Sequence, residues 1–144
     1  MTDVRLYHTV DGGEIEYAED GRFVLDDSPA TAAYLSLFGG NERDGGGAAT
    51  ERLQWWGNVV EEVETRRLRS ETQHLLRSLA AVTSNLRRIE DAAGRDLAWM
   101  TTELGATVEV RASMPAVRRV DLDITIEIDG TATELRFSAP WGPE

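Results

Sequence analysis

The sequence predicts an α+β fold, in which an N-terminal β meander precedes a helical layer packed on a C-terminal antiparallel sheet. The strongest observation is an unbroken alternation of apolar and polar residues over 120–129, which ends at the hairpin signal Asp129-Gly130. Apolar residues at steps of three and four from Leu86 to Leu104 indicate an amphipathic helix. Short alternating runs separated by Asp-Gly steps over 3–26 indicate the meander.

The 144 residues are most simply one domain, because a chain of this length can bury a substantial core. A hydrophobic content of 41% is typical of a globular protein. We expect five parts along the chain: a meander and short helix over 1–38, a flexible loop over 39–53, a helical part over 54–104, an antiparallel sheet over 105–138 and a tail over 139–144.

The first helix is expected to begin at Asp27-Ser28-Pro29. Asp27 or Ser28 can cap the free N–H groups of a helix start, and proline suits the first helical position. Its end is expected at Gly39-Gly40, because glycine tolerates the left-handed conformation that ends many helices. The glycine-rich loop that follows is long enough to be flexible or to be ordered by a partner.

Trp55 and Trp56 follow this loop, at the seam between the two halves of the chain. Two adjacent indoles either plug the core at that seam, or one of them anchors a partner protein. Residues 59–67 fit a helical turn as well as a strand. Residues 68–79 have helical spacing, with apolar positions at Leu68, Leu75, Leu76 and Leu79.

A longer helix is expected to begin at the caps offered by 83–85 and to continue to Leu104. On its outer face, Arg87–Asp91 and Asp91–Arg95 lie four residues apart, and each pair adds a few tenths of a kcal/mol. Gly94 costs about 1 kcal/mol relative to alanine inside a helix. We therefore expect this glycine to permit close packing against another element.

The C-terminal hairpin has a register that can be read residue by residue. If the turn is Asp129-Gly130, the pairs are Ile128 with Thr131, Ile126 with Thr133, Ile124 with Leu135 and Leu122 with Phe137. On the opposite face, Asp123 then lies across from Arg136. Together with the alternating run around Val108 and Val110, residues 106–138 form three antiparallel strands with one wet face. Trp141 lies beyond them in an irregular tail, mobile or used as an interaction arm.

The net charge of −11 argues against a nucleic-acid partner, because phosphate binding needs concentrated positive charge. Residues 1–64 carry fourteen acids and four arginines (net −10), whereas residues 65–95 carry seven arginines and three acids (net +4). This division indicates docking by charge complementarity, or simply an acidic solvated surface. No apolar run predicts a membrane span, Met1 to Arg5 do not begin a secretory signal, and the chain has no cysteine.

We find no catalytic motif in the sequence. His8 and His74 lie on unrelated elements without metal-ligand spacing, and Gly45–Gly47 lacks the lysine of a phosphate loop. The adjacent acids Asp26-Asp27 and Glu61-Glu62 are more simply a solvated surface than a glycosidase pair. The sequence therefore predicts a protein without catalytic activity, cofactor or metal.

Five stretches, in order, resemble the Mu-like phage baseplate protein family, which belongs to the sheath initiators of contractile tails. They are TAAYLSLFGGN at 31–41, QWWGN at 54–58, QHLLR at 73–77, NLRRIEDAA at 85–93 and DLAW at 96–99. The resemblance extends from about residue 3 to 129 and does not include the Trp141 tail. A short Glu/Pro/Arg motif of the wider group cannot be placed in this chain.

The resemblance implies a structural protein of the virion tail baseplate, assembled in the host cytoplasm. It implies six copies around the tail tube, each similar to the inner domain of the sheath subunit. The expected partners are the tail sheath protein, which adds a strand to the sheet, and the baseplate wedge protein, with the tail tube as a further neighbour. No membrane partner is expected.

Three groups of residues are predicted to contact these partners. They are Trp55, Trp56 and Asn58 beside the loop, Arg87 and Arg88 on the basic helix, and Val120, Leu122, Ile124, Ile126 and Ile128 on the sheet. Two alternatives stay open for the function: a peptidoglycan-degrading tail hydrolase, and a regulatory domain of the same fold that binds a host protein. Some members of the wider group were labelled lysozyme-like, but no residue pattern here supports that activity.

Overall fold

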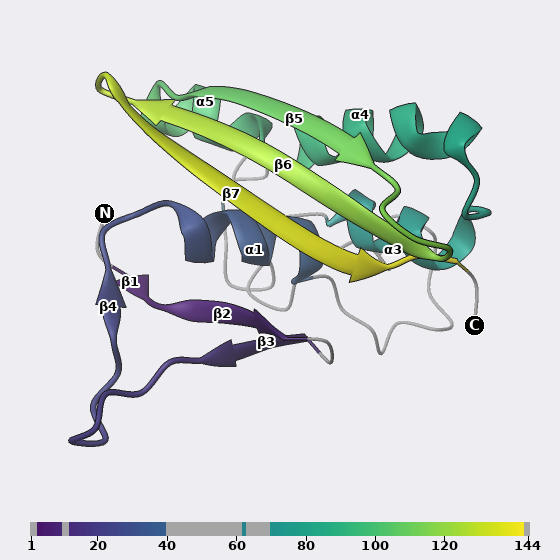
Figure 1. Ribbon diagram of the computed structural model, residues 1–144. Helices are drawn as coiled ribbons and strands as arrows, with labels where there is room; N and C mark the ends of the chain where they lie inside the picture. The colour runs from purple at the N-terminus through teal and green to yellow at the C-terminus, as the bar shows by residue number, and fades with distance from the viewer. Residues whose placement is uncertain (1–2, 10–11, 40–61, 63–69, 143–144) are drawn as a thin grey trace.

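A three-stranded antiparallel sheet and a layer of helices form the body of the protein (Figure 1). The computed structural model describes residues 3–9, 12–39, 62 and 70–142. The sheet has the order β5-β6-β7, with β5 at Thr107–Ser113, β6 at Arg119–Ile128 and β7 at Thr131–Pro140. The helices are α1 (Ala30–Phe38), α3 (Glu71–Ser78), α4 (Leu86–Asp96) and α5 (Ala98–Leu104). The predicted α+β class is confirmed.

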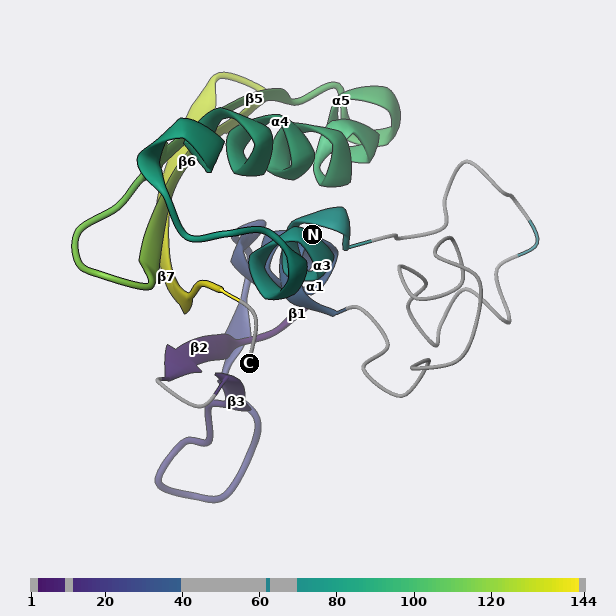
Figure 2. The same cartoon turned by 90° about the vertical axis from the view of Figure 1, so that its right-hand side faces the viewer.

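The helices share one face of the sheet, and the core lies between the two layers. Figure 2 shows the sheet close to edge-on, with α4, α3 and α1 on one side of it. Side chains of alternate β6 residues enter this core, where Leu122, Ile124 and Ile126 contact a cluster that includes Ile89 and Met100. The alternation of the sequence thus produces one buried and one wet face.

The predicted hairpin register is confirmed at every pair. Ile128 lies opposite Thr131 and Leu122 lies opposite Phe137. Asp129 and Gly130 have φ angles of 51° and 79°, the left-handed pair of a two-residue turn. On the wet face, Arg136 Nε lies 2.5 Å from Asp123 Oδ1, as the parity predicts.

The long helix predicted over 83–104 is divided into three pieces. A 3₁₀ turn at Thr83–Asn85 precedes α4, and the helix is interrupted at Leu97, between α4 and α5. Gly105, with a φ of 64°, then ends α5. The apolar stripe survives these breaks because Leu97 and Met100 are both fully buried.

Two further expectations about α4 are wrong. A Cβ added to Gly94 would meet nothing within 4 Å, so this glycine does not provide a close packing contact. Arg87 does pair with Asp91, at 3.2 Å. Arg95, however, makes two hydrogen bonds of 2.8 and 2.9 Å to Glu71 at the start of α3 rather than pairing with Asp91. The geometry of a carboxylate matches two N–H groups of one guanidinium, which favours Glu71.

The N-terminal strands form the predicted antiparallel meander and one pairing beyond it, because the first strand pairs with the last as well as with the second. β1 (Asp3–Val4) pairs with β4 (Leu25–Asp26), and β2 (Leu6–Thr9) pairs with β3 (Gly12–Ile15), in two separate sheets. The chain changes neighbours at Arg5, whose N–H donates to the Val24 carbonyl (2.8 Å) while its carbonyl accepts from the Glu16 N–H (3.0 Å). The first strand is therefore shared between two partners.

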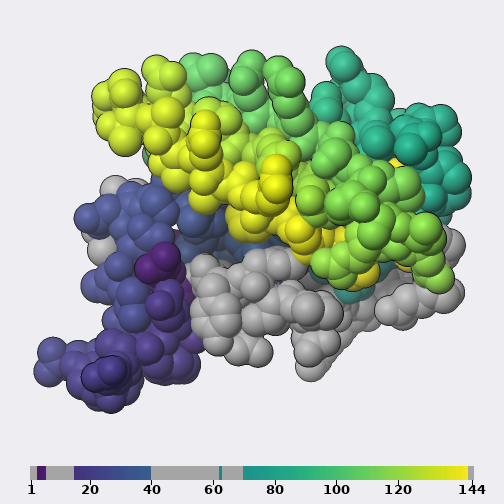
Figure 3. Space-filling view, in the orientation of Figure 1, coloured from purple at the N-terminus to yellow at the C-terminus, as the bar shows by residue number. Residues whose placement is uncertain are grey.

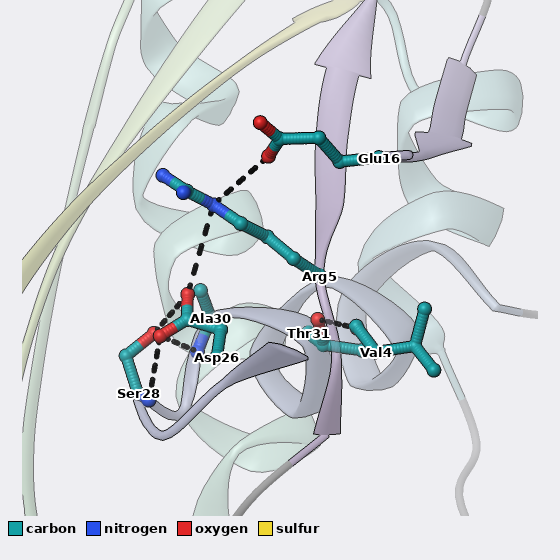
Figure 4. Close-up of polar contacts among 7 residues, drawn as sticks. All are labelled: Val4, Arg5, Glu16, Asp26, Ser28, Ala30 and Thr31. Atoms are coloured by element: carbon teal, nitrogen blue, oxygen red, sulfur yellow. Dashed lines mark hydrogen bonds and ion pairs between the residues drawn. The ribbon is translucent and has the colours of Figure 1, made fainter. Parts of the chain in front are cut away.

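Side chains at this junction hold the N-terminal strands to α1 (Figure 4). The Arg5 guanidinium lies 3.2 Å from Glu16 and 3.9 Å from Asp26. The Thr31 hydroxyl donates to the Val4 carbonyl at 2.7 Å. Hydrogen bonds from Ser28 lower the pKa of Asp26.

The ends of α1 follow the prediction in part. The Ala30 N–H donates to the Ser28 hydroxyl at 3.3 Å, so Ser28 serves the helix start and Pro29 directly precedes it. Gly39 has a φ of −81° and is not left-handed, so the helix does not end by that route at this residue. Gly40 lies outside the described residues.

Asp96 and Trp141 tie distant parts of the chain to α3. The Asp96 carboxylate accepts hydrogen bonds from the N–H groups of Glu71 (2.9 Å) and Thr72 (2.8 Å), which have no acceptor within the helix because they lie in its first turn. Trp141 is only 1% exposed, and its indole N–H donates to the Leu79 carbonyl at 3.1 Å. Trp141 itself is therefore part of the core, not of an interaction arm.

Candidate assembly surface

The backbone edges of the C-terminal sheet decide where another strand could join it. β6 has hydrogen-bonded neighbours on both sides, so its backbone has no free edge. The outer strands, β5 and β7, each have one edge directed away from β6. A sheet edge can accept a strand from another chain only where its N–H and C=O groups are free.

The register shows which groups of β7 point outward. A two-residue turn makes Ile128 and Thr131 the first hydrogen-bonded pair, and bonded and non-bonded pairs then alternate along the hairpin. The same alternation reaches the strand's end, where the Trp141 N–H donates to the Arg118 carbonyl at 2.8 Å. The N–H and C=O groups directed outward are therefore those of Ala132, Glu134, Arg136 and Ser138.

This β7 edge is open in the part of the chain that the structure describes. No backbone hydrogen bond joins those four residues to another described segment outside the sheet. Figure 3 shows β7 at the surface along the front of the molecule. The N-terminal strands, which could have covered the edge, pair with each other instead.

The opposite edge, on β5, is blocked by a helix. Alternation directs the Ala112 backbone away from β6, and the Ala112 N–H donates to Glu90 Oε2 of α4 at 3.0 Å. An inward-reaching carboxylate is one of the devices that protect an edge from pairing. The contrast leaves β7 as the edge suited to strand addition. Sequence reasoning missed Glu90, because only the packing of α4 beside β5 brings its carboxylate to this amide.

The sheet residues predicted to contact a partner do not lie on the open β7 edge. Val120, Leu122, Ile124 and Ile126 are fully buried in the protein's own core, and Ile128 is half-buried near the hairpin tip. Their side chains pack against the helices of the same chain. A strand added at β7 would form its backbone hydrogen bonds without touching these residues.

The other predicted partner residues divide into two groups. Arg87 and Arg88 are exposed on the first turns of α4, where Arg87 pairs with Asp91 at 3.2 Å. Trp55, Trp56 and Asn58 lie outside the described residues, so their predicted contact with the wedge stays a prediction.

Among the described groups, Asp96 has the pKa that is raised most clearly above its usual value. Burial raises the pKa of Asp96 to about 6, and the hydrogen bonds from the Thr72 and Glu71 amides oppose that rise. Both amides are already bound to its two oxygens, so this carboxylate supports α3. Within the described ranges, no three histidine or acidic side chains gather as metal ligands, and no helix is long and apolar enough for a membrane span.

Comparisons with protein-family models, with curated proteins and with solved structures give no match to this chain. The resemblance to the baseplate family therefore stays a prediction carried by the five sequence stretches.

Proposed function

We propose that the protein is a structural component of a contractile-tail baseplate, which templates the first sheath ring and joins the sheath to the baseplate wedge. The resemblance of the sequence to sheath initiators supports this role. The observation that carries it is the asymmetry of the sheet, in which no described segment pairs with the outer edge of β7, whereas Glu90 binds an outward amide of β5.

The proposed mechanism is strand addition along β7. A strand of the sheath protein pairs with the outward N–H and C=O groups of Ala132, Glu134, Arg136 and Ser138. Each hydrogen bond contributes about 0.5–1.5 kcal/mol net, so one added strand supplies a modest affinity. Repetition of the contact around a baseplate multiplies that affinity, because linked contacts form together.

The faces of β7 define what the added strand must present. Leu135 and Phe137 point to the core side. There the ring centroid of Phe137 lies 5.9 Å from the ring centroids of both Tyr34 and Phe38 of α1. Glu134 and Arg136 lie on the wet face. A matching strand therefore alternates apolar residues, which extend the core, with charged residues opposite Glu134 and Arg136.

Replacing Glu134 with proline tests this mechanism. Proline removes an outward N–H and leaves the hydrogen bonds to β6 in place, which edge strands tolerate. We expect Glu134→Pro to lose at least tenfold in its ability to start sheath polymerisation in vitro. The matched control, Glu134→Ala, removes the side chain and keeps the N–H, so it should start sheath growth like the unmodified protein.

Melting temperatures of both variants separate a blocked edge from a folding defect. If Glu134→Pro melts like Glu134→Ala and still starts sheath growth, strand addition at β7 is the wrong mechanism. If the unmodified protein starts no sheath growth, the baseplate role itself is wrong.

A further inference from the structure

Large apolar side chains exposed to solvent gather at two ends of the described structure. Four of them, Ile15, Tyr17, Phe23 and Leu25, lie on the N-terminal strands and the turn between them. The other two, Val82 and Val117, lie in the α3–α4 and β5–β6 connections. Isolated apolar residues on a surface are ordinary, but a cluster beside charged residues is typical of a binding site.

The first cluster forms an acidic end, which we define as residues 15–26. Tyr17 is 60% exposed, Phe23 is 52% exposed, and their ring centroids lie 5.4 Å apart. A backbone bridge joins the same two residues, so the aromatic pair has a defined position. Residues 15–26 contain four acids (Glu16, Glu19, Asp20 and Asp26) and one arginine.

The second cluster forms a basic end, which we define as residues 72–89 and 112–120. These two segments contain five arginines and no acid, and Glu90 and Asp91 lie next to them, beside Arg87. The arginines are Arg77, Arg87, Arg88, Arg118 and Arg119. Val117 is 87% exposed and Val82 is 47% exposed among them.

Trp141 holds the two segments of the basic end together. Its backbone N–H donates to the Arg118 carbonyl at 2.8 Å, and its indole N–H donates to the Leu79 carbonyl at 3.1 Å. Glu90 adds a second link, because it joins α4 to Ala112 at the end of β5. The basic end is therefore one surface, although residues 90–111 separate its two parts in the chain.

The two ends lie on opposite sides of the molecule. In Figures 1 and 3, the turn that follows β3 projects at the lower left, and the β5–β6 connection lies on the right-hand side. Contacts from Arg5 to Glu16 and from Thr31 to Val4 attach the acidic end to α1, so it has a fixed direction relative to the body.

We infer that copies of this protein associate head to tail, with the acidic end of one copy on the basic end of the next. The occupant is a second copy, because this chain itself carries both halves of a complementary contact: acids around an aromatic pair, and arginines around two exposed valines. Contact between two like ends would place charges of the same sign together. A head-to-tail contact uses different surfaces on its two sides and forms a ring or a filament.

The inference also predicts a strong dependence on salt. A net charge of −11 makes whole molecules repel one another, while the two ends attract at short range. Salt screens surface charges over a Debye length of about 8–10 Å near physiological ionic strength. This inference does not depend on the proposed baseplate function, which concerns the β7 edge.

Sedimentation velocity of the purified protein over a range of concentrations tests the inference. We expect the average mass to rise with concentration in about 50 mM salt and to fall toward the monomer when the salt is raised several-fold. Phe23→Ser removes half of the aromatic pair, and Arg88→Glu reverses a charge at the basic end. Each variant alone should associate at least tenfold more weakly than the unmodified protein.

A mixture of the two variants gives the decisive result. Arg88→Glu keeps an intact acidic end and Phe23→Ser keeps an intact basic end, so the mixture should form a dimer and stop there. Two substitutions serve as controls and should leave association unchanged: Arg88→Lys, which keeps the charge, and Glu127→Arg, which reverses an exposed charge outside both ends. A protein that stays monomeric at every concentration, or a mixture that forms no dimer, overturns the inference.

Discussion

At the scale of single residues, Asp96 and Trp141 connect parts of the chain that are far apart in sequence. Asp96 binds an amide 25 residues away, and the Trp141 indole binds a carbonyl 62 residues away. Both side chains are buried, and each satisfies a polar backbone group of α3 or of the turn that follows it. An unpaired buried donor or acceptor costs about 1–3 kcal/mol, so both contacts matter to the stability of the fold.

Asp96 should make stability depend on pH. Its pKa is about 6 in the folded protein, above its usual 3.8, because burial disfavours the charged form. Its contribution is therefore fully present below about pH 4 and is lost as the pH rises through about 6. The loss is on the order of 3 kcal/mol. Urea unfolding at several pH values from 4 to 8, compared with Asp96→Asn, measures it.

The comparison with Asp96→Asn isolates this one group from the other acids. The unmodified protein should lose stability relative to Asp96→Asn as the pH rises from 4 to 8. A gain in relative stability over the same interval would mean that the two amide donors outweigh burial and that the pKa of Asp96 is lowered.

Replacing Trp141 tests whether the tail belongs to the core. Trp141→Ala should cost about 3–5 kcal/mol, the usual effect of removing a large buried aromatic side chain. Trp141→Phe keeps most of the packing but leaves the Leu79 carbonyl without its donor, so a smaller cost is expected. Val117→Ala, at an exposed site, should change the free energy of unfolding by less than about 0.5 kcal/mol. If Trp141→Ala and Val117→Ala change the free energy of unfolding equally, Trp141 does not belong to the core.

At the scale of elements, the sheet is asymmetric although its strands look alike in sequence. β5 and β7 both alternate apolar and polar residues, and both lie at an edge. Only the packing of α4 beside β5 distinguishes them, because it brings Glu90 to the Ala112 amide. The position of α4 therefore determines which outer strand keeps an open edge: α4 lies beside β5, so the open edge is that of β7.

Hydrogen exchange should reveal the open edge amide by amide. Thr133, Leu135 and Phe137 direct their N–H groups to β6 and should exchange slowly. Ala132, Glu134, Arg136 and Ser138 direct theirs outward and should exchange at least a hundredfold faster. Amide-resolved NMR exchange measures this pattern, and uniform protection along β7 would contradict an open edge.

At the scale of the whole molecule, the sequence predicts local structure well and long-range contacts poorly. The β6–β7 register was predictable at each pair, because a two-residue turn and an alternation of period two leave one arrangement that buries the apolar face. The start of α1 directly after Ser28-Pro29 and the amphipathic stripe of α4 and α5 follow from the same local signals. The shared strand at Arg5 was not predictable, because its two partners are eleven and nineteen residues further along the chain.

The candidate surfaces follow the same division. Alternation in the sequence indicated a sheet suited to strand addition. The side chains predicted from it as partner contacts lie on β6, however, and most of them are buried in the core. The charge difference between the two halves was visible in the sequence, whereas the grouping of exposed valines and aromatic residues with those charges required the fold. Trp55, Trp56 and Asn58 lie outside the described residues, so their partner contact stays a prediction.

The sequence by itself determined the α+β class, the hairpin register, the acidic first half and the basic stretch at 65–95, because turn geometry, periodicity and charge are local properties of the chain. Tertiary structure decided the remaining features. It placed Trp141 in the core and set Asp96 at the start of α3. It also brought Glu90 to the β5 edge of the sheet and left the β7 edge without a partner among the described residues. Each of these depends on two segments meeting in space, and the free energy of such a contact arises only when the whole core assembles.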